Sequence, residues 1–201
     1  MRYLPIFLLL LVSCITENIS LENDPIIQKH FVENEIILLS SLLNYFDNEV
    51  LDMSKKKQIN SAYVSIIEMV KDTSESKFNY VHLDEMNTLK LDSVLKTFPD
   101  STKREIWYWY DSINSYTKDS TFVFDIHPNG KYGSFLEAAG KKSSFVMEYY
   151  EDFPIAAAST PTMHVNMILN ADKLNLRLER ERLIYAIHFV SILRAGIGNE
   201  I

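Results

Sequence analysis

The chain has 201 residues and a formal net charge of −7, with 27 acidic against 20 basic side chains. This length is typical of one domain with a sizeable core, and the acidic balance disfavours nucleic acid, whose binding depends on neutralising phosphates. Cys14 is the only cysteine, so the chain cannot form an intramolecular disulfide and packing must supply its stability.

The first fourteen residues have the pattern of a signal sequence. Arg2 supplies a positive charge, and an apolar run from Leu4 to Val12 follows, interrupted only by a proline. This run is shorter than the roughly 20 apolar residues of a membrane span, but it fits the apolar region of a secretory leader. It ends in Leu11-Val12-Ser13-Cys14, which resembles the lipobox of bacterial lipoprotein signal peptides.

This resemblance covers residues 1–14 and implies a cleaved signal peptide at 1–13 and lipid attachment at Cys14. The residues that follow predict a polar tether at 14–24, lipidated at its first residue, and a single helical domain at 25–201. Two or more acyl chains give stable membrane anchoring, whereas one is marginal. Enterobacterial sorting retains lipoproteins with an aspartate after the cysteine in the inner membrane. Ile15 stands there instead, so we expect the outer membrane, with the leaflet left open. The alternatives are a cleaved secretory signal without lipid and a buried apolar segment with an ordinary core cysteine.

The first half of the mature chain has helical periodicity. Asp24-Pro25 is a good helix start, and we predict one helix from there to near Leu51. Ser54 is the expected cap of a second helix, which forms an antiparallel hairpin with the first. A third helix is predicted over Asp84–Phe98, where Pro99 ends it.

The middle of the chain combines a capping pattern with a strand-like stretch. Thr102-x-x-Glu105 matches a capping box and predicts a fourth helix that runs to Tyr116. Residues 121–127 alternate as a strand does, and Pro128-Asn129-Gly130 supplies a turn. No clear second strand follows, so we expect at most a small hairpin with Lys131-Tyr132.

Further helices complete the chain. They are expected from Ser134-x-x-Glu137 to Gly140, around Phe145, Tyr149 and Phe153 as far as Pro154, from Thr160-Pro161 onward, and from a start between Asp172 and Arg177 to Ala195. The last helix should lie at the centre of the fold, because Leu183–Leu193 is almost entirely apolar. The predicted fold class is all-α, an irregular bundle of about seven helices with at most one small β-hairpin.

The sequence offers no catalytic residue with a specific signature, and we expect no cofactor. Glycine-rich phosphate loops, dinucleotide fingerprints and zinc-protease or nucleophile-elbow motifs are missing. The five histidines lack the spacing that places two on one helix face, so no metal site is predicted, although distant histidines could still assemble. His188 would need a buried partner within its apolar helix, and His127 is interpreted as a turn residue. Glu148 and Asp152 should share a helix face; paired carboxylates can do acid–base chemistry on sugars, but acids at this spacing more often face water.

The segment Trp107-Tyr108-Trp109-Tyr110 concentrates four aromatic side chains. On a helix they would spread over most of the circumference, so some must lie outside the core. Trp107, Tyr108 and Tyr110 are therefore the candidate binding surface, since Trp and Tyr dominate interaction hot spots. In the structural alternative Trp109 and Ile106 point inward, and Trp107 or Tyr108 covers the rim of the core.

Three functional hypotheses follow. The first is a lipid-anchored envelope protein, without enzymatic activity, that binds a protein or glycan partner and no nucleic acid. The second is an anchored hydrolase of envelope polymers that uses Glu148, Asp152 or His188. The third is a small-ligand-binding lipoprotein with a pocket between helices. Polar side chains converging on a concave pocket would favour the second or third, and an exposed aromatic patch without a pocket the first.

Overall fold

The computed structural model describes residues 19–73, 88–113, 116, 118, 120–152 and 161–197. Within these residues it is mostly helical with one small antiparallel hairpin, which confirms the predicted fold class. The elements are α1 (Pro25–His30), α2 (Glu33–Ser54), α3 (Ile59–Thr73), α4 (Thr88–Lys96), α5 (Asp100–Arg104), β1 (Trp107–Ile113), β2 (Ser120–Ile126), α6 (Lys131–Gly140), α7 (Ser144–Asp152), α8 (Pro161–Leu169) and α9 (Glu179–Ile197).

Several sequence predictions lie outside the described residues. They are the leader with Cys14, the start of the third helix at Asp84, and the helix boundaries at Phe153, Pro154 and Thr160. The described part of the third helix is α4, and it ends before Pro99 as expected.

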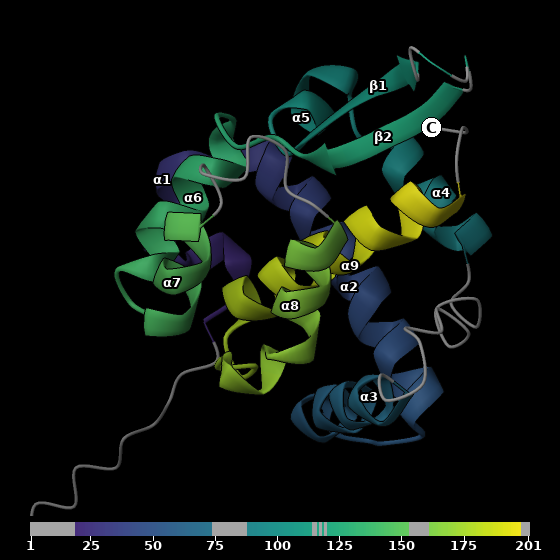
Figure 1. The fold of residues 1–201 in the computed structure, drawn as a ribbon. Coiled ribbons are helices and arrows are strands. Elements are labelled where there is room, and N and C mark those ends of the chain that lie inside the picture. Colours follow the sequence, from purple (N-terminus) through teal and green to yellow (C-terminus); the bar gives the residue numbers. More distant parts are fainter. Residues whose placement is uncertain are drawn as a thin grey trace, which may run out of the picture.

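Helix α9 is the centre of the fold, as its apolar sequence predicts. Every side chain from Leu183 to Leu193 is buried. Figure 1 shows α9 running through the middle of the molecule, with α2, α8 and the hairpin packed around it. It starts at Glu179, later than expected, because residues 171–173 form a 3-10 turn and the Glu181 carboxylate accepts the Asn175 N–H at 2.6 Å. None of the described helices is long and apolar enough to cross a membrane.

Residues before α1 belong to the folded domain. The Leu21 side chain is fully buried, and its backbone N–H donates to the Glu179 carboxylate at 2.8 Å. Asp24 caps α1 as predicted, accepting the Ile26 N–H at 2.9 Å, and it also accepts from the Arg180 guanidinium at 2.7 Å. Residues 21–24, which we expected in the tether, are therefore part of the domain.

The predicted first helix is interrupted. Phe31 is extended, at φ −124° and ψ 141°, and separates α1 from α2. The Glu35 carboxylate accepts the Val32 N–H at 3.0 Å, which satisfies a donor at the start of α2. At the other end, α2 includes Ser54 and terminates at Lys55, whose φ of 56° is left-handed. Ser54 is thus the last residue of α2 and does not cap α3.

The aromatic segment is a strand, so the predicted fourth helix to Tyr116 is wrong. β1 pairs antiparallel with β2, in a register that places Trp107 opposite Ile126 and Tyr110 opposite Val123. β2 therefore pairs with β1 and not with Lys131-Tyr132. Trp and Tyr favour strands because their side chains pack well across a pleated surface, and here each lies beside another apolar or aromatic side chain.

The two predicted capping boxes, Thr102-x-x-Glu105 and Ser134-x-x-Glu137, do not start helices where expected. The contacts of Glu105 explain why. Thr102 is buried inside α5, and the Glu105 carboxylate instead accepts the Lys131 N–H at 3.0 Å, while the Glu105 carbonyl accepts the Tyr132 N–H at 3.1 Å. Helix α6 therefore starts at Lys131, before the predicted start at Ser134. A side chain at Gly130 would stand 2.3 Å from the Glu105 carbonyl oxygen, so this approach requires glycine.

Candidate binding groove

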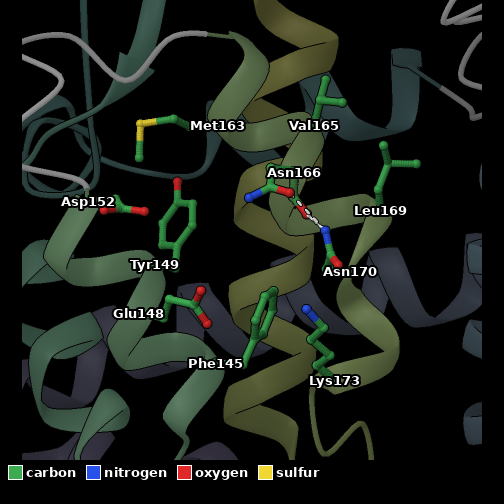
Figure 2. A pocket seen from close by; sticks show the side chains of 10 residues that line it. All are labelled: Phe145, Glu148, Tyr149, Asp152, Met163, Val165, Asn166, Leu169, Asn170 and Lys173. Atoms are coloured by element: carbon green, nitrogen blue, oxygen red, sulfur yellow. Dashed lines mark hydrogen bonds between the residues drawn. The ribbon is translucent and has the colours of Figure 1, made fainter.

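A groove of about 690 Å³ separates α7 from α8, within the roughly 300–1,000 Å³ of small-molecule sites. Helix α7 contributes four residues with one-face spacing, and α8 with the turn after it contributes six. The lining is Phe145, Glu148, Tyr149, Asp152, Met163, Val165, Asn166, Leu169, Asn170 and Lys173, which Figure 2 shows from close by.

The two walls of the groove differ in charge. The α7 wall carries both carboxylates, Glu148 and Asp152, which share a face as their spacing predicts. The opposite wall carries amides and a cation: the Asn170 side chain donates to that of Asn166 at 2.8 Å, and the Lys173 ammonium lies 5.3 Å from the centre of the Phe145 ring. Phe145 thus stands between Glu148 and Lys173, as Figure 2 shows.

This arrangement does not favour acid–base hydrolysis in the groove. Glycosidases place two carboxyl groups on either side of the bond that breaks. Here the described residues of the facing wall include no acid, and Glu148 and Asp152 lie exposed on a single helix. The groove combines apolar surface with polar side chains, which suits binding.

Beneath the groove, four side chains from four elements form a buried chain of hydrogen bonds. The Tyr149 hydroxyl on α7 is 3.3 Å from Nδ1 of His188 on α9. The same nitrogen is 2.9 Å from Nδ1 of His164 on α8, whose Nε2 is 2.8 Å from Oδ1 of Asp125 on β2. All four side chains are at most 5% exposed.

The Asp125 carboxylate determines which atom donates in its hydrogen bond to His164. A carboxylate only accepts, so Nε2 of His164 carries the hydrogen in that bond. Nδ1 of His164 and Nδ1 of His188 share the next hydrogen bond, which leaves Nε2 as the other ring nitrogen of His188. That Nε2 is buried and has no hydrogen-bond partner within the described part of the chain. Burial and then the neighbouring His164 hold the pKa of His188 well below its ordinary value, so His188 is neutral.

These hydrogen bonds connect both walls of the groove to one atom, Nδ1 of His188. Tyr149 lines the α7 wall, while His164 lies between Met163 and Val165 on the α8 wall. Both bond to Nδ1 of His188 on the central helix. His188 therefore has the buried partners that its apolar surroundings required, and it sets the spacing of α7 and α8.

The predicted aromatic surface is only partly exposed. Trp107 is 1% exposed, and its indole N–H donates to the Ser191 hydroxyl at 3.1 Å, so its inclusion in a binding surface is wrong. It lies inward at the start of β1, where its ring stacks on Phe124 and its N–H reaches α9. Tyr108 is half-buried and donates to Asp125 at 3.5 Å, and burial followed by Asp125 raises its pKa to about 12. Tyr110 is 50% exposed and stacks on Tyr108, with ring centres 6.1 Å apart.

The sequence analysis missed Asp125 and His164. His164 occupies an inward position of α8, in line with the buried residues Met167, Ile168 and Ala171. A histidine within such an apolar stripe is the signal that could have revealed it, because a buried polar side chain needs a partner. Asp125 gave a weaker signal, since it alternates with apolar neighbours in a strand.

The described residues contain no group of three or more His, Cys, Asp or Glu side chains that could hold a metal ion. Comparison with protein-family models, curated proteins and solved structures gives no significant match.

Proposed function

We propose that this protein is a lipoprotein of the bacterial cell envelope, anchored at Cys14 in the outer membrane, whose domain binds a small amphiphilic molecule between α7 and α8. The lipobox pattern of residues 11–14 supports the anchor. The groove carries the binding proposal, because its volume suits a small molecule and it joins apolar to polar surface. No enzymatic step is part of the proposal.

The charges of the groove select the ligand's polar end. Glu148 and Asp152 give the lining two negative charges against the one positive charge of Lys173. The whole chain is also acidic, at −7. An amine or another cationic group can pair with the α7 wall while an alkyl or aromatic body packs against Met163 and Leu169. An anionic amphiphile would meet net repulsion.

Calorimetric titration with decylamine and decanoate, both below their micelle concentrations, tests this proposal. We expect decylamine to bind and decanoate to bind at least about tenfold more weakly, a difference of roughly 1.4 kcal/mol. Asn166→Trp fills the groove and should abolish decylamine binding. Asn48→Trp is the matched control, since Asn48 is also an exposed helical asparagine but lies on α2. Equal binding by the two variants would contradict the proposal.

The exposed end of the hairpin favours a second candidate function, the binding of a protein or glycan partner. Tyr110, Ile113 and Tyr116 are 50%, 67% and 94% exposed. Such large apolar side chains cluster at interaction sites. Tyr108, stacked beside Tyr110, would form the inner edge of this surface.

Photo-crosslinking separates the partner classes. A photoreactive amino acid at Tyr110 should form one defined adduct in intact cells if the partner is a protein. Sedimentation with purified peptidoglycan should be lost on Tyr110→Ser if it is a glycan. The same two experiments with the probe or the serine at Val64, an exposed apolar residue on α3, serve as the control. No adduct and unchanged sedimentation would exclude this surface.

A further inference from the structure

A second groove lies where the chain joins the folded domain. It has a volume of about 660 Å³ and is lined by Glu22, Gln28, Phe31, Val32, Glu33, Ile36 and Ile37. Phe31 and Ile36 are almost completely buried, whereas Val32 is 61% and Ile37 50% exposed. Two large aliphatic side chains therefore line this groove with their surfaces open to solvent. We call Val32, Ile36 and Ile37 with the flanking Glu22 and Glu33 the proximal face.

The proximal face is close to the expected anchor. Ile19 is the first described residue, only five positions after Cys14. Because an extended chain spans at most about 3.3–3.6 Å per residue, Ile19 lies within roughly 18 Å of the lipidated cysteine and Glu22 within roughly 29 Å. The hydrogen bond from Leu21 to Glu179 fixes the far end of this connection to α9. The connection is thus shorter than a tether reaching to Asp24 would be.

We propose that the proximal face rests on the lipid bilayer that holds Cys14, with Val32 and Ile37 against the apolar boundary of the headgroup region. This inference rests on the lipid anchor of the proposed function. The short connection keeps this part of the domain next to the membrane, and burying exposed aliphatic surface in the interface is favourable. The protein thereby takes a fixed orientation on the membrane.

The negative charge of the proximal face indicates which lipid headgroup it can contact. Glu22 and Glu33 line the groove, and the chain carries a net charge of −7, so an anionic bilayer would repel this face. A zwitterionic bilayer rich in phosphatidylethanolamine has no net charge, and its ammonium groups can pair with the two carboxylates. The matching surface is therefore a zwitterionic lipid with an amine headgroup.

Spin labels on single introduced cysteines test the contact in the acylated full-length protein. Acylation consumes the only native thiol, so Ile37→Cys can be labelled alone after reconstitution into vesicles of phosphatidylethanolamine and phosphatidylcholine. We expect several-fold more collisions with oxygen, and several-fold fewer with a water-soluble nickel chelate, than for the control Val64→Cys. Val64 is 45% exposed on α3, which lies away from α1 in Figure 1, and its surroundings are mainly polar. Val32→Cys repeats the test at a second position.

The outcomes separate this inference from the proposed function. Vesicle flotation together with equal nickel access at Ile37 and Val64 would overturn the membrane contact and leave the anchor intact. Protection of Ile37 from both reagents would show that protein, such as a second copy of this chain, covers this face, and it would also overturn the contact. Failure to float, with Cys14 still reactive as a thiol, would overturn the anchor and the inference together. Decylamine binding reports on the groove between α7 and α8 independently of all three.

Discussion

Helix α9 carries two buried polar clusters, and they differ in how completely they are paired. Around Arg182, the guanidinium donates to the Asp47 carboxylate through Nε at 3.2 Å and Nη2 at 3.1 Å, and to the Leu176 carbonyl at 3.1 Å, while the Tyr63 hydroxyl donates to Asp47 at 2.7 Å. Around His188, Nδ1 is shared between two partners, and Nε2 has none within the described residues.

Because of this difference, we interpret the Arg182 cluster as purely structural and the His188 cluster as one whose hydrogen bonds can rearrange. The Arg182 cluster joins α2, α3 and α9 through charged groups that are nearly saturated, so any other arrangement would leave a charge unpaired. The His188 cluster is neutral at its centre and lies under the groove. The bonds that His188 makes can be rearranged at lower cost than those of Arg182, because His188 itself carries no charge. We therefore expect substitutions in the Arg182 cluster to lower the free energy of unfolding strongly. Substitutions in the His188 cluster should lower it less, and by an amount that depends on pH.

The largest effect is expected for Asp47→Ala. This change removes the carboxylate that pairs most closely with the buried Arg182 charge and accepts from the Tyr63 hydroxyl. It should lower the free energy of unfolding by about 3–5 kcal/mol in urea titrations. Asp172→Ala is the control, because the Lys71–Asp172 ion pair, with side chains 42% and 54% exposed, should contribute less than about 1 kcal/mol. Similar losses for the two variants would remove the distinction between the clusters.

An intermediate, pH-dependent effect is expected for His188. Its pKa in the folded protein lies well below the ordinary value of 6.5, because burial and then His164 disfavour the charged form. The unfolded chain therefore binds more protons, and the stability present above pH 6.5 falls as pH decreases through that value, by up to about 1.4 kcal/mol per unit for one group. Tyr132, Tyr149 and His164 lie against the ring, and Asp125 bonds to the far nitrogen of His164.

His188→Leu isolates this contribution. At pH 7.5 it should cost about 1–3 kcal/mol, because His164 and Tyr149 each lose a buried partner. As the pH is lowered to 5, the wild type should lose stability faster than the variant, so the two unfolding free energies converge. His30 also has a lowered pKa, through burial and Lys29, and its contribution is common to both proteins. Parallel pH profiles would refute the assignment.

The sequence predicted those features that depend on residues close together along the chain. The central position of α9 follows from its apolar run, and the start of α1 from Asp24-Pro25. The strand at Trp107 was missed because Thr102 and Glu105 imitate a local cap, whereas Glu105 in fact binds the start of α6, 26 residues later. The His188 chain was out of reach for the same reason: its partners come from residues 125, 149 and 164, on three other elements.

The smallest effect is expected for Tyr149→Phe, which removes one hydroxyl and keeps the ring in the groove. His188 retains its bond to His164, so the free energy of unfolding should fall by only about 1 kcal/mol. The variant nevertheless loosens the α7 wall from α9, and amide hydrogen exchange should quicken in α7 more than in α8. Tyr150→Phe, at the half-buried neighbouring residue, should leave both helices unchanged. A loss as large as that of Asp47→Ala would mean that the His188 cluster is as tightly paired as the Arg182 cluster, and that it does not adjust the groove.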